Sequence, residues 1–338
     1  MEKKRCNIRD LAKAAGLSAG TVSRILNNRP GKMKIPEQTR SRVVELAREL
    51  QYVPNIHARR LFTRRSGVIG FVIPSSRRSG ETAFGNSHLS HVFAGMETRL
   101  DEGARSIELV VSNTQFVETH SCLARFRDGS IDGLLIWGAY EDELFWQELV
   151  DSRYPYVFVG GYPRLESWVN CVTNDDAYAA GVITEHILKA GHRRVLFLEN
   201  APGRSPAWHR SFGVNAALAN QGLPPECVQV TNAPAEQVLQ ELRAGGSDAT
   251  AIVTADYRQA ELFRGMEISV GCCSTYPGEA VAWPGLARVE NDDAQIGQEA
   301  IRAIENIIDA GDPFLVNLAI KGRFIEGETI VKIKKGKS

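Results

Sequence analysis

The chain has 338 residues, of which 43% are hydrophobic and 24% are charged, with 40 Lys and Arg against 40 Asp and Glu. This length is sufficient for two or three domains with well-buried cores, and no apolar run approaches the roughly 18–20 residues of a membrane span. The first residues also lack the apolar segment of a secretory signal, so we expect a cytoplasmic protein without a membrane anchor.

The charge is distributed unevenly along the chain. Residues 1–65 hold sixteen Lys and Arg against five Asp and Glu, so the remainder carries an equal excess of acidic groups. A basic head on an acidic body is typical of a DNA-binding module joined to a sensor domain. A basic run can also be a solvated surface without a partner, and only the pattern within the head favours the first interpretation.

Two short helices are predicted within the basic head. The first has an apolar face with the i, i+3, i+4, i+7 spacing of an amphipathic helix, formed by Ile8, Leu11, Ala12 and Ala15. Asn7 stands at its N-cap position, Asp10 supports its first turn, and Gly16 ends it. Ser18 can cap a second helix, whose apolar residues pack back on the first: Val22, Ile25 and Leu26. Two short helices joined by a glycine turn are a helix-turn-helix.

A third helix is predicted after Pro36, because Val43, Leu46, Ala47 and Leu50 repeat the same apolar spacing. It closes a three-helix core and leaves the outer face of the second helix with small and polar residues: Ala19, Gly20, Thr21, Ser23 and Arg24. In a helix-turn-helix, the N-terminal residues of the second helix meet base edges in the major groove, while flanking hydroxyls and amides hold phosphates.

From Gly67 onward the pattern changes to strands that alternate with helices. We predict strands at 67–74, 107–111, 131–137, 156–160, 195–198, 249–254 and 268–270. Helices are predicted at 92–100, 116–126, 177–190, 212–220, 235–243 and 296–310. Such repetition favours an α/β fold with parallel sheets covered by helices on both faces.

The two sets of strands indicate two lobes, with a ligand bound between them outside the carboxyl ends of the strands. We therefore predict an all-α DNA-binding domain at 1–53, a hinge and linker at 54–66, and a two-lobed domain at 67–338. The first lobe is predicted at 67–165 plus 292–312, and the second lobe at 166–291 plus 313–331.

Several short motifs carry a resemblance to a known family. In the head these are Asp10-Leu11-Ala12, Ala15-Gly16, Thr21-Val22-Ser23-Arg24, Leu26-Asn27, and Tyr52-Val53-Pro54-Asn55 with Ala58 and Leu61. In the body they are Ile131-Asp132-Gly133, residues 172–175, residues 191–195, residues 210–213, and Ile296-Gly297 with Ala300. The head resembles the lactose/galactose-repressor (LacI/GalR) family of bacterial transcription factors, and the body is similar to periplasmic sugar-binding proteins.

The resemblance implies roles for residues of the head. Ala19, Gly20 and Arg24 would lie at the bases, with Arg24 as the donor to a guanine edge. Phosphates would be held by Thr21, Ser23, Asn27 and Asn55. Residues 54–61 would form a hinge helix only on DNA, where Ala58 permits close approach of two such helices and Leu61 is the wedge between base pairs.

For the body, the resemblance places the effector near Arg210, Asp256, Asn291 and Trp208, and Trp137 could offer a second ring face. The alternatives are a surface or salt-bridged Arg210, a structural Asp256, and tryptophans that belong to the core. The chain departs from the family pattern at Gly271-Cys272-Cys273-Ser274, where an acid that commonly binds sugar hydroxyls is missing. The effector could therefore be another sugar, a phosphorylated or otherwise modified sugar, or a weakly bound regulator.

We thus predict a cytoplasmic, nucleoid-associated homodimer that acts as a ligand-responsive repressor on a pseudo-palindromic DNA operator, without a cofactor, metal ion or membrane. A periplasmic-type solute-binding protein is the alternative. Residues 16–20 match the G-x-S-x-G motif of hydrolases, but no strand precedes Ser18, which argues against an enzyme. The six cysteines lack metal-site spacing, and the Cys272-Cys273 pair is interpreted as core packing, with a redox role as the alternative.

Overall fold

The computed structural model describes residues 6–26, 35–52, 65–79, 82, 85–101, 105–140, 145–200, 203–311 and 315–333. The chain forms two compact units, Met1–Ser66 and Gly67–Ser338, which we describe separately. Over the described residues, every helix is too short or too polar to cross a bilayer.

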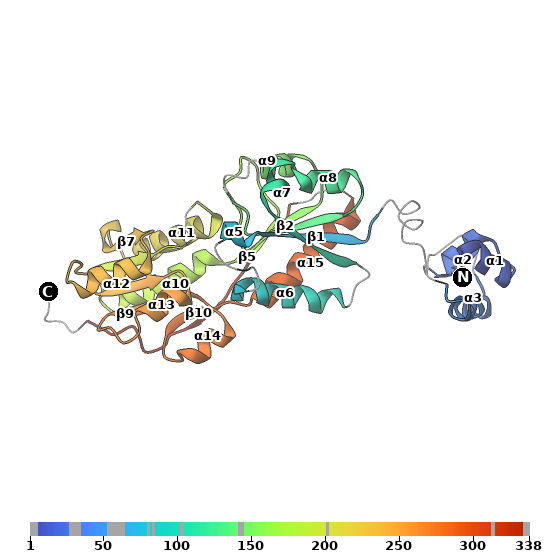
Figure 1. The fold of residues 1–338 in the computed structure, drawn as a ribbon. Helices are drawn as coiled ribbons and strands as arrows, with labels where there is room; N and C mark the ends of the chain where they lie inside the picture. The colour runs from blue at the N-terminus through green and yellow to red at the C-terminus, as the bar shows by residue number, and fades with distance from the viewer. Residues whose placement is uncertain are drawn as a thin grey trace. The chain divides into compact units, whose positions relative to one another are not determined.

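The first unit contains three helices: α1 (Ile8–Ala15), α2 (Ala19–Leu26) and α3 (Glu37–Glu49) (Figure 1). The predicted cap is present, because the Asn7 side chain accepts from the backbone of Asp10, whose carboxylate accepts from the Asn7 backbone. Gly16 ends α1 at φ 70°, a left-handed conformation that glycine adopts without strain. The helices enclose a small core of Leu11, Ala12, Ala15, Val22, Ile25 and Val43.

The second unit contains two six-stranded sheets (Figure 1). The first has the order β11-β5-β4-β3-β1-β2 and consists of β1 (Val68–Pro74), β2 (Ser106–Ser112), β3 (Gly133–Trp137), β4 (Tyr156–Val159), β5 (Cys171–Asn174) and β11 (Asn317–Ile320). The second has the order β12-β10-β9-β8-β6-β7 and consists of β6 (Val195–Leu198), β7 (Val228–Thr231), β8 (Ala251–Thr254), β9 (Ser269–Thr275), β10 (Ala287–Glu290) and β12 (Arg323–Ile325). Only β12 pairs antiparallel among these strands.

Helices cover both faces of each sheet, as the alternating pattern predicts. Those of the first lobe are α5 (Ser76–Ser79), α6 (Ser87–Leu100), α7 (Thr114–Glu118), α8 (Ser121–Arg127), α9 (Phe145–Asp151) and α15 (Asp293–Ala310). Those of the second lobe are α10 (Asp176–Lys189), α11 (Ser205–Asn220), α12 (Ala235–Arg243), α13 (Tyr257–Leu262) and α14 (Pro277–Ala282), with a 3-10 turn at Pro225–Cys227. Successive residues of β1 enter different cores, since Phe71 packs with the α6 and α15 side and Val72 with the α8 and α9 side.

The lobe boundaries differ from the predicted ones. The predicted second lobe consists of residues 166–291 and 313–331, but β5 and β11 belong to the first sheet. The physical reason is strand pairing: Phe158 of β4 lies opposite Cys171 of β5, and β5 in turn pairs with β11. The chain therefore leaves the first lobe after Asn174 rather than at 166.

The single helix predicted at 116–126 is also two helices. α7 ends at Glu118 and α8 begins at Ser121, and between them His120 adopts φ 48°. This left-handed residue breaks the helical hydrogen bonding and turns the chain. The apolar periodicity alone gave no indication of the break.

Candidate functional site

The outer face of α2 is the candidate DNA-contacting surface of the first unit. Ser18 starts the helix by accepting a hydrogen bond from the Thr21 backbone N–H at 3.1 Å, and its hydroxyl also lies 2.9 Å from Thr21 Oγ1. Val22 and Ile25 are buried on the inner face, whereas Gly20 is exposed and Arg24 is half-buried. Of the predicted base-contacting residues, Gly20 and Arg24 lie on the side of α2 away from the core, whereas Ala19 is half-buried and packs against the core.

Gly20 leaves this position of α2 without a side chain. A Cβ atom added there would meet only Ser18 Oγ, at 3.9 Å. The missing side chain is therefore not required by packing within the unit. Four other predicted DNA contacts, Asn27, Asn55, Ala58 and Leu61, lie outside the described residues.

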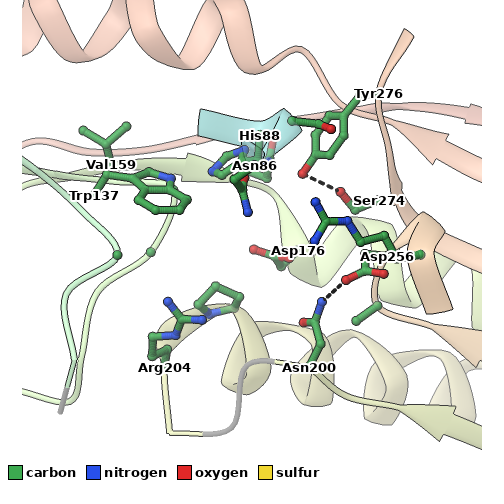
Figure 2. A pocket seen from close by; sticks show the side chains of 18 of the residues that line it. Asn86, His88, Trp137, Val159, Asp176, Asn200, Arg204, Asp256, Ser274 and Tyr276 are labelled. Carbon is green, nitrogen blue, oxygen red and sulfur yellow. Dashed lines mark hydrogen bonds between the residues drawn. The ribbon is translucent and has the colours of Figure 1, made fainter. Parts of the chain in front are cut away.

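A cavity of about 270 Å³ lies between the lobes of the second unit, where the carboxyl ends of both sheets meet (Figure 2). The first lobe contributes mostly aromatic, amide and apolar side chains, which include Asn86, His88, Trp137, Tyr140, Val159 and Asn174. The second lobe contributes charged and polar ones, which include Asp176, Asn200, Arg204, Arg210, Asp256, Arg258, Ser274, Tyr276 and Glu279. This is the position expected of a ligand in a doubly wound fold.

Arg210 lines the cavity from α11, but most of its hydrogen-bonding capacity is used within the protein. Its Nε donates to Glu199 Oε2 at 2.9 Å and its Nη1 to Asp176 Oδ1 at 2.9 Å. Its Nη2 donates to Glu199 Oε1 and to Asn200 Oδ1, the latter at 3.2 Å. These bonds use four of the five N–H groups of a guanidinium. Its predicted effector contact stays a prediction, and its observed contacts are with the protein.

The Arg210 cluster carries more negative than positive charge. Burial raises the pKa of Asp176 to about 6, because the attraction of Arg210 is opposed by both desolvation and the neighbouring Glu199. Burial by itself would lower the pKa of Arg210, but Asp176 and Glu199 raise it above its ordinary value. Glu199, which is not among the residues predicted from the sequence, holds this arginine in place by a paired hydrogen bond.

Asp256 also lines the cavity, and it has a structural role as well. Its carboxylate caps α13 by accepting from the Gln259 backbone N–H at 3.0 Å, and it accepts from the Asn200 amide. The predicted aspartate is thus correctly placed beside the cavity, with part of its acceptor capacity used by the protein.

Asn291 and Trp208 are predicted effector contacts that are absent from the described cavity lining. The Asn291 amide donates a hydrogen bond at 2.9 Å to the hydroxyl of Ser274, which itself lines the cavity. Trp208 packs against Tyr162, with Arg164 5.1 Å above its ring. The helix explains this difference, because Pro206 and Arg210 are one turn apart and share a face, whereas residue 208 points away from it.

Trp137 lines the cavity, and beside it lies His88, which is not among the residues predicted from the sequence. His88 Nδ1 lies 2.8 Å from Asp293 Oδ2, and Asn174 Nδ2 donates to Asp293 Oδ1 at 3.2 Å. The His88 ring stacks on Tyr276 with centroids 6.0 Å apart. Burial opposes protonation of His88, but Asp293 outweighs it and the pKa of His88 is raised.

The vicinal cysteines are part of the core. Cys272 and Cys273 are consecutive on β9 and point into opposite clusters, both fully buried. Burial raises the pKa of Cys272 to about 12 and that of Cys273 above its ordinary value. Both thiols are therefore protonated, which favours the packing role. In the described part of the chain, no three His, Cys, Asp or Glu side chains gather as metal ligands.

Two family models match the chain. One is described as "Bacterial regulatory proteins, lacI family" and matches residues 7–55. The other is described as "Periplasmic binding proteins and sugar binding domain of LacI family" and matches residues 66–241. Together they span both the helical unit and most of the two-lobed unit.

Individual proteins similar in sequence to this chain are also transcriptional regulators. The HTH-type transcriptional regulator MalR of Streptococcus pneumoniae is 28% identical over 64% of this chain and 63% of its own length. The sucrose operon repressor of Klebsiella pneumoniae is 30% identical over 68% of this chain and 66% of its own length. These alignments thus span slightly less than two thirds of the relatives.

Solved structures share the fold. The lac repressor dimer bound to operator and the anti-inducer ONPF has a TM-score of 0.74 at 20% identity, and covers 97% of this chain and 100% of that one. The complex of the transcriptional regulator CelR with cellobiose has a TM-score of 0.64 at 21% identity, and covers 96% of this chain and 100% of that one. At these identities the likeness concerns the fold.

Proposed function

We propose that this chain, which belongs to the LacI family of bacterial regulatory proteins, is a DNA-binding transcriptional repressor whose operator affinity is changed by a small molecule in the cleft. The observation that carries this proposal is the presence, in one chain, of a helix-turn-helix and a two-lobed unit with a cavity at its strand ends. A solute-binding protein would account for the cavity but not for the helical unit.

For DNA recognition we propose that Ala19, Gly20 and Arg24 lie against base edges, with Arg24 donating to a guanine. Thr21 and Ser23, followed by Asn27 and Asn55, would hold phosphates. Ala58 and Leu61 would belong to a hinge that pairs with that of a second subunit in the minor groove. Their support is the resemblance of the sequence together with the position of the exposed Gly20 and the half-buried Arg24 on α2.

For the effector we propose a sugar or sugar derivative. Trp137 offers an aromatic face, while the amides of Asn86 and Asn200 can pair with hydroxyls. Ligand binding would change the relative orientation of the two lobes and thereby favour or disfavour the DNA-bound hinge, with a coupling free energy of about 1–3 kcal/mol. Such a protein would act as a cytoplasmic homodimer on a pseudo-palindromic operator, and would have no catalytic role.

The test is titration of the full chain against a pseudo-palindromic operator and a scrambled duplex by fluorescence anisotropy at two salt concentrations. We expect at least about 10³-fold preference for the operator and a steep salt dependence. Because the preferred operator is not known in advance, selection from random DNA precedes the titration. Equal weak binding to selected and scrambled duplexes would refute the proposal.

Arg24→Ala sharpens this test. The loss of a bidentate base contact should flatten the preference between sites by about 1–3 kcal/mol while non-specific binding changes less. Arg9→Ala, on the exposed part of α1, is the matched control for the loss of one positive charge. Equal losses on specific and random DNA would show that Arg24 contacts phosphate only.

A further inference from the structure

Arg204 differs from the other charged side chains around the cavity. It is half-buried at the start of α11, and among the described residues no carboxylate lies within ion-pair distance of it. Burial lowers its pKa, and this is opposed by the nearby Tyr140 and Glu199 and reinforced by Arg210. In Figure 2 its side chain extends from the start of α11 toward Trp137, away from the Tyr276 side of the cavity.

The remaining charges of the lining are engaged by the protein. Asp176 is bonded to Arg210, Asp256 caps α13, and Glu279 accepts from the Tyr276 backbone N–H at 3.0 Å. Arg258 donates to the Gly85 carbonyl at 3.3 Å. Desolvating a guanidinium without an anionic partner costs free energy, which a bound anion would recover.

We infer that the molecule bound in this cleft carries an anionic group, a carboxylate or a phosphate, that pairs with Arg204 beside the ring of Trp137. This inference rests on the proposed effector role of the cleft and adds a chemical class to it. A planar guanidinium with two parallel N–H groups matches either oxyanion in bidentate fashion.

The size of the cavity limits the rest of the ligand. About 270 Å³ is close to the lower end of the roughly 300–1,000 Å³ of small-molecule sites, so the ligand is closer to one sugar ring than to a long chain. Trp137 offers a ring face, and Asn86 offers hydrogen bonds to hydroxyls. Together these features fit a sugar acid or a sugar phosphate, and Arg204 is the residue that would distinguish it from a neutral sugar.

The test uses the full chain and three probes: inorganic phosphate, D-glucuronate and neutral D-glucose. Thermal unfolding and calorimetric titration are measured at matched ionic strength, with potassium chloride as the reference salt. The variants are Arg204→Met, which keeps the length of the side chain, Arg204→Lys, which keeps its charge, and Arg164→Met. Arg164 is an exposed arginine outside the described cavity lining, which makes it the matched control.

We expect saturable binding of phosphate or glucuronate to the unmodified chain and to Arg164→Met, and at least about tenfold weaker binding to Arg204→Met. Arg204→Lys should fall between them, because it keeps the charge but not the bidentate geometry. Stronger binding of glucuronate would identify a carboxylate, and stronger binding of phosphate a phosphate.

Absence of binding by both anions, equal anion binding by Arg204→Met, or tighter binding of glucose than of either anion would overturn the inference. A clear drop in the unfolding temperature of ligand-free Arg204→Met would also do so, since it would show that the guanidinium is held by the protein. These titrations contain no DNA, so their failure is distinct from failure of the operator assay, which tests the regulator proposal itself.

Discussion

The two lobes of the second unit share an architecture but present different chemistry to the cavity. Each has a six-stranded sheet with the same order of connections, and they differ in the edge strand, since β11 is parallel and β12 antiparallel to its neighbour. The first lobe lines the cavity with Trp137, Tyr140 and Val159, whereas the second lines it with charged groups such as Arg204 and Asp256. The chemistry therefore resides in the loops and helix starts after the strands rather than in the sheets.

In both lobes a glycine permits two helices to cross closely. In the first, α6 and α15 cross so closely that a Cβ on Gly297 would lie 1.9 Å from the Val92 carbonyl oxygen. In the second, α10 and α11 cross so that a Cβ on Gly213 would lie 2.1 Å from the Ala177 carbonyl oxygen. The scaffold is thus repeated, while most of the charged groups of the cavity lining belong to the second lobe.

The largest expected effect comes from removing the buried cation of the second lobe, Arg210. Arg210→Met leaves Glu199 and Asp176 buried without their cation, which should cost about 3–5 kcal/mol in the free energy of unfolding. Urea denaturation at pH 7 measures it. On the first lobe, His88→Gln should cost only about 1–2 kcal/mol, because Asp293 loses one 2.8 Å contact and still accepts a hydrogen bond from Asn174. Similar losses at both positions would contradict the contrast between the lobes.

The two close helix crossings should be equally sensitive to substitution. The expected loss in the free energy of unfolding at each is slightly smaller than that of Arg210→Met. Gly213→Ala and Gly297→Ala should each cost about 3 kcal/mol, because each new methyl group overlaps a backbone carbonyl that cannot move without separating two helices. Gly278→Ala on α14, where a Cβ would meet nothing within 4 Å, is the control and should not destabilise the chain, with a gain of at most about 0.5–1 kcal/mol. A large loss in only one lobe would show that the crossings are not equivalent.

The next effect is a pH dependence of the free energy of unfolding, caused by Asp176 in the second lobe. The pKa of Asp176 is about 6 in the fold against an ordinary value of 3.8, so between these values the folded chain binds a proton that the unfolded chain releases. Stability from this group is complete below about pH 4 and is lost as the pH rises through 6. The Asp176→Asn variant has no carboxylate to titrate at this position. The difference in the free energy of unfolding between this variant and the unmodified chain should therefore shift in favour of the variant from pH 4 to pH 6.5, by on the order of 1–2 kcal/mol.

Unfolding temperatures of both chains across this range check the prediction. Asp292→Asn, at the N-cap of α15 and outside the described cavity lining, is the control for removal of one carboxylate from a helix start. A constant difference between Asp176→Asn and the unmodified chain would show that Asp176 is ionised throughout.

The sequence predicts the fold well wherever local patterns decide it. Asn7, Gly16 and Ser18 specify the ends of α1 and α2 through caps and a left-handed turn, and the structure has all three features. The apolar runs 195–198 and 235–243 coincide with β6 and α12. The predicted lobe boundary was wrong because strand pairing between β4, β5 and β11 joins residues far apart in the chain.

The candidate site was predictable only in part. Arg210, Asp256 and Trp137 lie at the cavity, as the resemblance and the strand ends indicated. Glu199 and His88 were missed because their importance depends on partners that the sequence does not place beside them, Arg210 and Asp293. Trp208 was predicted from its residue type, while its direction depends on where α11 begins, and this helix starts at Ser205 rather than at 212.

The smallest expected effect concerns Gly20 on α2, which, unlike Gly213 and Gly297, does not permit a close helix crossing. At the crossings a methyl group meets backbone, but at Gly20 it meets only Ser18 Oγ at 3.9 Å, so Gly20→Ala should stabilise the helical unit by about 0.5–1 kcal/mol. Ala14→Gly, an exposed position on α1, is the mirror control and should lose a similar amount. Thermal unfolding and operator titration are read together. Higher stability with weaker operator binding would mean that Gly20 serves close approach to DNA, whereas unchanged binding would remove it from the contact surface.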